Sequence, residues 1–196
     1  VFLRWIALVG QYVTISFVYI VLNFNFEIIY CSLIIFVGVI TNLYLQFKIK
    51  ENQLKDFTST VFLVYDVLQL SGLLYFTGGI TNPFSILLIV PAIVSSTFLS
   101  LRSTVNLSFL TIVVLILITI YYMPLPSAGD LHFHVPDYYL FAIPSAIIIG
   151  LVFLTYFGAR FGIESRKRTE ALNKLELILA KEHELESIGL QAAAAA

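Results

Sequence analysis

Residues 73–90 read LLYFTGGITNPFSILLIV, and a polar, bend-prone segment in their middle separates one apolar run from the next. Gly78 and Gly79 permit positive φ. Asn82 is driven toward extended conformations by Pro83, which itself suits the first turn of a helix. The segment therefore predicts a tight connector between two helices that each cross a membrane.

The chain as a whole has the composition of a membrane protein. Of its 196 residues, 59% are hydrophobic and 12% are charged, whereas soluble domains have about 45–50% and about 25%. The formal net charge of −1 gives no reason to expect a nucleic-acid partner. The single cysteine, Cys31, allows neither an internal disulfide nor a multi-cysteine metal site, and we expect it to be a small buried apolar residue.

Six segments are apolar enough to span a bilayer, which takes about 20 residues in an α-helix. They are residues 3–22, 27–47, 58–77, 84–101, 104–122 and 138–158. The predicted fold class is all-α, an integral membrane bundle of six transmembrane helices followed by a cytoplasmic signalling helix with coiled-coil character. The predicted domains are residues 1–159, in the membrane, and residues 160–196, outside it.

The basic residues predict the orientation of these spans. All 11 fall on one side of the predicted membrane: Arg4, Lys48, Lys50, Lys55, Arg102, Arg160, Arg166, Lys167, Arg168, Lys174 and Lys181. Because cytoplasmic loops carry the excess of Lys and Arg, both ends of the chain are predicted to be cytoplasmic. The segment from Gly78 to Phe84 then lies at the outer surface of the membrane.

Residues 160–196 are charged, rich in helix formers and free of proline. One set of positions alternates in steps of four and three: Ala171, Leu175, Ile178, Glu182, Leu185, Gly189 and Ala192. This spacing is typical of a coiled coil, and we expect a parallel homodimer. A solvated amphipathic helix is the alternative, because Glu182 and Gly189 are poor core residues.

The residue types of the segment 78–84 also suit a ligand. The backbone N–H groups of Gly78 and Gly79, expected to be exposed at membrane depth, would need partners. Asn82 can donate and accept hydrogen bonds beside a helix N-terminus. Flat apolar surface flanks these groups at Tyr75, Phe76 and Phe84. A quinone, with ring carbonyls and an apolar tail, fits this combination, and a purely structural turn is the alternative.

Several stretches resemble one known family. GGITNPF at 78–84 resembles the GGxxNPF heptapeptide of the RegB/PrrB/ActS family of redox-responsive sensor histidine kinases. RWIALVGQ at 4–11 resembles that family's first span, and residues 66–96 resemble its third and fourth spans. ESIGLQAAAAA at 186–196 resembles the run that leads into the family's phosphoacceptor box. The chain has no initiator Met, so we expect it to be part of a longer protein.

The resemblance implies a sensor domain in the bacterial inner membrane that binds ubiquinone, forms a homodimer and acts through a cognate response regulator. The implied quinone-binding residues are Gly78, Gly79, Ile80, Thr81, Asn82, Pro83 and Phe84. Among them, Asn82 and Phe84 are expected to touch the ligand and the others to shape the loop. The parent protein is implied to be an ATP-dependent histidine kinase, with ATP and Mg²⁺ bound in a region that follows this chain. No catalytic residue is expected within residues 1–196.

Asp66 and Gln69 lie one helical turn apart on the same face of the third predicted span. Both are expected to project into the bundle rather than toward lipid. A carboxylate within a membrane suggests a functional role such as signal relay, and a bond to a neighbouring helix is the alternative. The distance from Asp66 to Gly78 is about 18 Å along a helix, too far for Asp66 to contact a ligand at the loop.

Other polar features carry weaker predictions. His132 and His134 form an HxH pair, with Asp130 and Asp137 as the nearest further ligands, but we expect no metal site. His183, although followed by Glu-Leu, is expected to lie on a solvated helix face.

Pro91 and Pro144 fall within predicted spans and can kink them. Two other classes of function are alternatives to the sensor: a small membrane transport protein, and a quinone-linked electron-transfer subunit.

Overall fold

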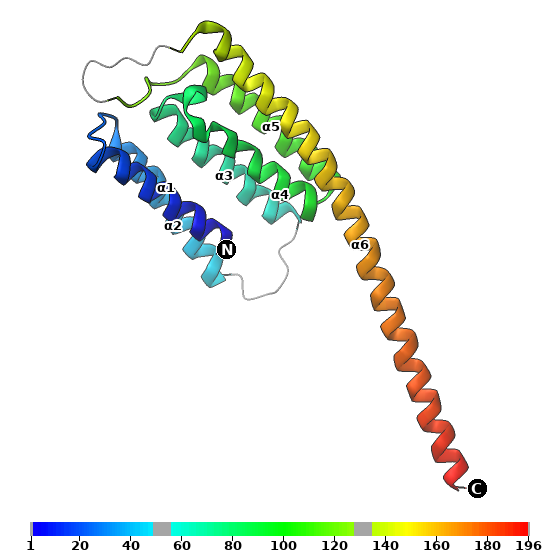
Figure 1. The fold of residues 1–196 in the computed structure, drawn as a ribbon. Helices are drawn as coiled ribbons and strands as arrows, with labels where there is room; N and C mark the ends of the chain where they lie inside the picture. Colours follow the sequence, from blue (N-terminus) through cyan, green and yellow to red (C-terminus); the bar gives the residue numbers. More distant parts are fainter. Residues whose placement is uncertain (1, 49–55, 128–134, 196) are drawn as a thin grey trace.

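The structure is a computed structural model, and it describes residues 2–48, 56–127 and 135–195. The helices are α1 (Phe2–Ile20), α2 (Ile28–Lys48), α3 (Asp56–Phe76), α4 (Val90–Phe98), α5 (Leu101–Ile120) and α6 (Asp137–Ala195). Two 3-10 helices, η1 (Gly79–Thr81) and η2 (Pro83–Ile89), connect α3 to α4. The predicted all-α membrane bundle with a long C-terminal helix is confirmed (Figure 1). Predictions that concern Lys50, Lys55, Asp130, His132 and His134 lie outside the described residues.

Five of the described helices are long and apolar enough to cross a membrane: α1, α2, α3, α5 and the first part of α6. The fourth predicted span differs, because its apolar stretch covers only Pro83–Phe98 and begins as the seven-residue 3-10 helix η2. A 3-10 helix rises about 2.0 Å per residue and an α-helix about 1.5 Å, so η2 and α4 together reach about 28 Å. This length nearly matches the hydrocarbon core of a bilayer, about 30 Å.

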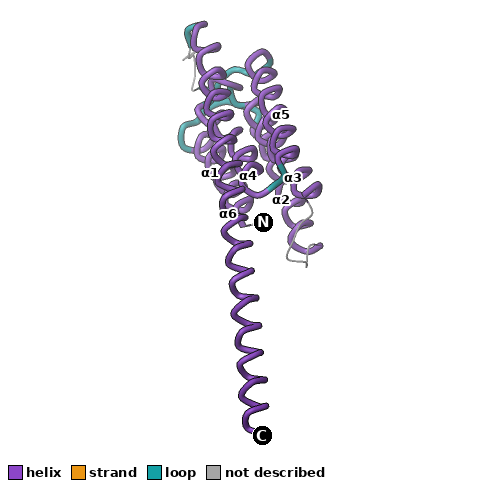
Figure 2. The backbone as a smooth tube through the Cα atoms, turned by 90° about the vertical axis from the view of Figure 1, so that its right-hand side faces the viewer, coloured by secondary structure: helices purple, strands orange, loops and turns teal. Residues whose placement is uncertain are grey.

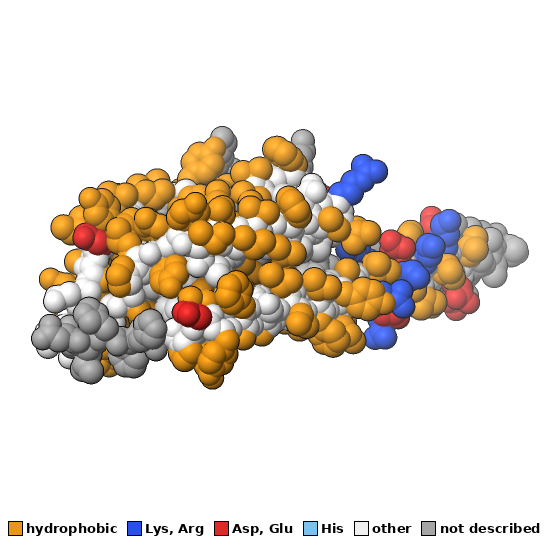
Figure 3. All heavy atoms as spheres, turned by 90° about the horizontal axis from the view of Figure 1, so that it is seen from above, with side chains coloured by type: hydrophobic (Ala, Val, Ile, Leu, Met, Phe, Trp, Pro, Cys, Tyr) orange, Lys and Arg blue, Asp and Glu red, His pale blue; other side chains and the backbone are white. Residues whose placement is uncertain are grey.

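Helix α6 joins the sixth predicted span to the predicted signalling helix without a break. It runs through 59 residues, and Pro144 lies inside it without ending it. Its C-terminal part extends far beyond the other helices (Figure 2). On the face seen in Figure 3, most charged side chains gather along this projecting part, whereas the bundle is mostly apolar.

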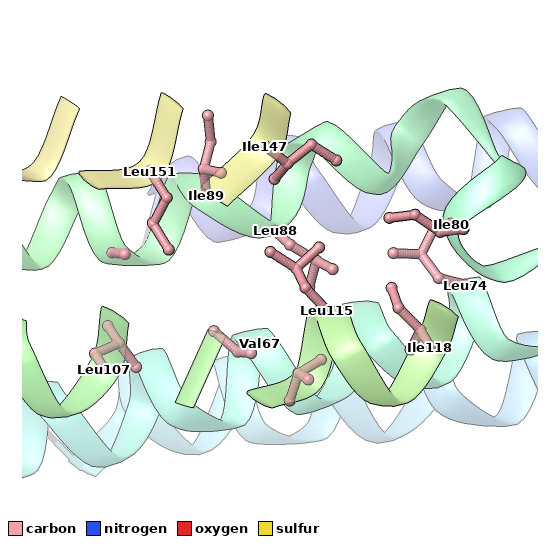
Figure 4. Packing of buried hydrophobic residues seen from close by; sticks show 12 residues of the cluster. Val67, Leu74, Ile80, Leu88, Ile89, Leu107, Leu115, Ile118, Ile147 and Leu151 are labelled. Carbon is pink, nitrogen blue, oxygen red and sulfur yellow. The ribbon is translucent and has the colours of Figure 1, made fainter. Parts of the chain in front are cut away.

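The buried apolar residues form two separate groups. The larger one joins α3, η1, η2, α4, α5 and α6, and its members include Val67, Leu74, Ile80, Leu88, Leu107, Leu115, Ile118, Ile147 and Leu151 (Figure 4). The smaller one joins α1 and α2 to α3 through Leu8, Ile15, Cys31, Ile35 and Leu73. The fold is therefore a bundle of α3 to α6, with an α1–α2 hairpin packed against α3.

Candidate functional site

The heptapeptide Gly78–Phe84 forms a compact loop at the end of the bundle opposite the projecting part of α6 (Figure 1). The predicted positive φ is present at Gly78 (109°) and Gly79 (57°). A Cβ atom on Gly78 would lie 2.5 Å from Leu125 Cδ1, and one on Gly79 would lie 2.6 Å from the carbonyl oxygen of Ile118. The expectation that these two glycines are exposed is therefore wrong: both are buried, because the end of α5 and the chain after it cover them.

The side chain of Asn82 is used within the loop itself. Its Nδ2 donates to the carbonyl oxygen and to Oγ1 of Thr77, each at 2.9 Å, and its Oδ1 accepts from the backbone N–H of Phe84 at 2.9 Å. With ψ at 124°, Asn82 is extended, as predicted for a residue before Pro83. A ligand would have to break the bonds to Thr77 before the amide N–H groups of Asn82 could donate to it.

The other residues of the loop divide by exposure. Ile80 is 1% exposed and belongs to the main core, and Thr81 Oγ1 donates to the carbonyl oxygen of Gly78 at 2.6 Å. Pro83 and Phe84 are exposed, and the Phe84 side chain is 47% accessible. The loop therefore has a buried side, where Thr81 and Asn82 form internal hydrogen bonds, and an apolar, partly aromatic side that faces outward.

The chain between α5 and α6 holds the loop in place. The backbone N–H of Met123 donates to the carbonyl oxygen of Tyr75 at 2.8 Å. Ser127 accepts from the backbone N–H of Asn25 at 3.2 Å, which joins this segment to the turn between α1 and α2. Three connections that are far apart in the sequence thus meet at one end of the molecule.

Asp66 forms an ion pair with Arg4 of α1. Arg4 Nε and Nη2 lie 2.9 and 2.8 Å from Asp66 Oδ1, and Nη2 also donates to Thr41 Oγ1 of α2 at 3.4 Å. The rings of Phe62 and Tyr65 each lie 5.6 Å from the guanidinium carbon, within range of a cation–π contact. The carboxylate thus bonds a neighbouring helix, which was the structural alternative for this residue.

Gln69 forms a second polar contact one turn farther along α3. Its Nε2 donates to Gln11 Oε1 of α1 at 3.1 Å, and the residue is 8% exposed. A Cβ atom on Gly38 of α2 would lie 2.7 Å from Gln69 Nε2 and 2.6 Å from Leu8 Cδ2. The absence of a side chain at Gly38 therefore lets Gln69 reach α1. As predicted, Asp66 and Gln69 project into the bundle.

Two groups in this region have no hydrogen-bond partner among the described residues. Asn42 of α2 is fully buried, and both polar atoms of its side chain are unpaired. Arg4 Nη1 is also buried and unpaired. An unpaired polar group in an apolar interior costs about 1–3 kcal/mol. The polar contacts between the hairpin and α3 are thus only partly satisfied within this chain.

Residues 14–172 match the family of PilS-like transmembrane domains, which is most of the chain. The chain belongs to this family. The match begins within the first predicted span and ends in the projecting part of α6. The chain is a multi-pass membrane protein.

The whole chain is also 34% identical, over 197 residues, to the sensor histidine kinase RegB of Cereibacter sphaeroides, and it spans 43% of that relative's length. The resemblance to the RegB/PrrB/ActS family, drawn from GGITNPF and its neighbours, is confirmed. No solved structure matches the chain.

The structure also places the secondary candidates among the described residues. Cys31 is fully buried, as predicted. His183 lies on the exposed part of α6, where its side chain is 81% accessible and its Nδ1 is 3.8 Å from Glu186 Oε2. Pro91 lies in the first turn of α4, directly after the 3-10 helix, rather than inside a long helix. Asp137 is the first residue of α6.

Sequence reasoning missed two features of the described chain. Arg4 entered only as a basic residue that sets orientation, because its partner is 62 positions away. Gly158 and Gly162 of α6 pack against the end of α4, and their GxxxG spacing, typical of close helix contacts in membranes, was the available signal.

Proposed function

We propose that this chain is the membrane sensor of a two-component histidine kinase and that it binds a quinone at the loop Gly78–Phe84. The observation that carries the proposal is the division of this loop into two sides. Buried glycines and internally bonded Thr81 and Asn82 make it rigid, while Pro83 and Phe84 face outward. A rigid loop with an exposed aromatic face is a suitable contact for a flat, membrane-soluble ring.

The exposed residues around the loop define how such a ligand would lie. Phe84 (47% exposed) and Tyr75 (39%) offer ring faces for stacking. Leu87 of η2 and Val90 of α4, three and six residues after Phe84, are also exposed and apolar, and they would contact the isoprenoid tail. In this proposal Asn82 shapes the loop, since its amide is already bonded, and Phe84 makes the main ligand contact.

Redox sensing follows from the chemistry of the quinone. The oxidised ring has carbonyl acceptors and the reduced ring has hydroxyl donors, so a fixed set of protein groups binds the two forms with different affinity. That difference in affinity is the only free energy available to shift the conformation of the protein. Ubiquinone is the quinone that the family resemblance favours.

The projecting part of α6 supports the proposed output. Large apolar side chains are exposed along this charged helix, among them Leu172, Leu175, Ile178, Leu179 and Leu185. A second copy in parallel would cover them, so we propose a homodimer in the inner membrane with both ends of each chain in the cytoplasm. The kinase region would follow this helix and would phosphorylate a response regulator.

The proposed site is tested by one pair of variants. Phe84→Ala removes the exposed ring, whereas Ile86→Ala, at 54% exposure, removes a similar apolar surface two residues away. In nanodiscs that contain purified protein and ubiquinone, we expect Phe84→Ala to weaken quinone binding by about tenfold, the size of a stacked ring contact. Ile86→Ala, which retains the ring, is expected to change affinity by less than about threefold.

Asn82→Ala should also weaken binding, because the loop loses its bonds to Thr77 and Phe84. Unchanged quinone affinity in both Asn82→Ala and Phe84→Ala would show that the ligand does not bind at this loop.

A further inference from the structure

The cytoplasmic end of α4 lies directly against α6. A Cβ atom on Gly162 would lie 2.5 Å from the carbonyl oxygen of Thr97, and one on Gly158 would collide with the hydroxyl oxygen of Ser96. Ser96 is 1% exposed, and its hydroxyl donates to the carbonyl oxygen of Ile93 at 2.7 Å. The two glycines therefore let the backbone of α6 contact the last turn of α4.

Arg166 strengthens this contact one turn farther along α6. Its Nη2 donates to the carbonyl oxygen of Leu99, the residue that caps the end of α4, at 3.3 Å, and its Nε donates to the carbonyl oxygen of Gly162 at 3.3 Å. A cation at the C-terminal end of a helix is favoured by the helix dipole. Arg166 thus joins α4 to the part of α6 that leaves the bundle.

The other end of α4 is continuous with the heptapeptide loop through η2. Asn82 caps η2, and η2 passes into α4 at Val90. Seven residues is long for a 3-10 helix, whose hydrogen-bond geometry is poorer than that of an α-helix. Conversion of η2 to an α-helix would shorten it by about 3.5 Å. The loop and the α4–α6 contact therefore lie at the two ends of one continuous element, whose length would change if η2 became α-helical.

We propose that α4 transmits the state of the loop to the cytoplasm, and that Gly158, Gly162 and Arg166 are the residues through which it moves α6. This inference rests on the proposed sensor function. The alternative route for the signal would run through the chain after α5, which also contacts the loop, at Leu125. In the α4 path, a change in η2 shifts the last turn of α4, and α6 shifts with it because no side chain separates the two backbones.

A double-mutant cycle tests the contact directly. Gly158→Ala places a methyl group against the hydroxyl of Ser96, and Ser96→Ala removes that hydroxyl, so the double variant should regain the close approach. Gly150→Ala is the matched control, because it is the same substitution on α6 and a Cβ atom there meets no other atom within 4 Å. Each variant is made in the full-length sensor kinase in nanodiscs.

Two quantities are measured for each variant: quinone affinity, and the ratio of autophosphorylation rates with reduced and oxidised ubiquinone. We expect Gly158→Ala to reduce that ratio by about fivefold, with quinone affinity within about twofold of wild type. The double variant should recover most of the ratio, and Gly150→Ala should retain it. A double variant no better than Gly158→Ala, or an equal loss in Gly150→Ala, would overturn the proposal.

A second pair of variants keeps the test decisive if Gly158→Ala does not fold. Arg166→Gln removes the bond to Leu99 at an exposed position. Arg168→Gln is its control, since the Arg168 guanidinium is paired with Glu164 of its own helix. Arg166→Gln should reduce the ratio by about threefold and Arg168→Gln should not change it. An unchanged ratio in Arg166→Gln would contradict a role for this residue.

Failure of the quinone proposal gives a different result. If the wild-type protein binds no quinone at the loop, the same variants are compared by their ligand-free autophosphorylation. Gly158→Ala should then change that rate, Ser96→Ala should restore it in the double variant, and Gly150→Ala should leave it unchanged. Equal ligand-free rates in all variants would reject transmission through α4 independently of the ligand.

Discussion

The α1–α2 hairpin and the α3–α6 bundle are held together by different interactions. The bundle has a continuous apolar core in which Val67, Leu88, Leu107, Leu115 and Leu151 are fully buried. The hairpin has a smaller apolar contact, and it is joined to α3 by the ion pair of Arg4 and Asp66 and by the bond between Gln11 and Gln69. Of the 19 residues of α1, only Leu8 and Ile15 are buried within the described chain.

This difference follows from the solvent. In a bilayer, lipid tails are as apolar as leucine, so close packing and interhelical hydrogen bonds provide the attraction between helices. The bundle relies on close packing, since Gly79, Gly158 and Gly162 admit neighbouring backbone or side-chain atoms to within contact distance. The hairpin relies on a few polar bonds, some of whose groups lack partners. We therefore expect the hairpin to detach from α3 more readily than the bundle opens.

The largest effect is expected from a cavity in the bundle core. Leu115→Ala removes a fully buried side chain of α5, and it should lower the free energy of unfolding by about 3 kcal/mol. Leu117→Ala on the same helix is the control, because that side chain is 48% exposed and should matter little. The free energy of unfolding of both variants is measured by titration with a denaturing detergent in mixed micelles. Equal losses in the two variants would contradict a packed core around α5.

A smaller and more local effect is expected at the ion pair. Asp66→Asn keeps the shape of the side chain but leaves the Arg4 guanidinium without its carboxylate, and it should weaken hairpin docking by about 2 kcal/mol. Amide hydrogen exchange in nanodiscs should rise in α1 and α2 and not in α5.

The double variant Arg4→Gln with Asp66→Asn, which has no unpaired charge, should lie closer to wild type than Asp66→Asn alone. Exchange that rises equally in α5 would show that the hairpin and the bundle open together.

The smallest effect on hairpin stability is expected at Gly38 of α2, which the Gln69 side chain passes on its way to α1. Gly38→Ala places a methyl group against the ends of the Gln69 and Leu8 side chains, both of which can move, so a cost of about 1 kcal/mol is expected. Gly10→Ala on α1 is the control, since a Cβ atom there meets nothing within 4 Å. The same hydrogen-exchange measurement compares them. A hairpin as stable in Gly38→Ala as in Gly10→Ala would mean that the close approach at Gly38 contributes nothing.

Much of the fold could be predicted because each helix is determined locally by its own residues. Five of the six predicted spans correspond to helices of spanning length, and the predicted continuation of the last span into a charged helix is present as α6. The positive φ values at Gly78 and Gly79 and the extended Asn82 before Pro83 were also readable from residue type. The 3-10 start of the fourth span was not predicted, because hydropathy does not distinguish a 3-10 helix from an α-helix.

The candidate site was predictable as a loop but not as a set of contacts. The sequence indicated that Asn82 can donate and accept hydrogen bonds, yet its partners Thr77 and Phe84 depend on how the loop closes. The burial of Gly78 and Gly79 depends on Leu125 and Ile118, which are 47 and 39 positions away in the chain. Side-chain type limits what a residue can bond, whereas its surroundings decide which bonds it makes.

By itself, the sequence determined that this chain is a membrane bundle with a polar loop between its third and fourth spans and a charged helix at its end. Those properties depend on hydropathy, helix propensity and the backbone preferences of glycine and proline, all of which act over a few residues. Only the tertiary structure decided that Arg4 pairs with Asp66, that Gln69 crosses Gly38, and that Gly158 and Gly162 lie against α4. These contacts join residues separated by 31 to 65 positions, and they exist only once the helices have packed.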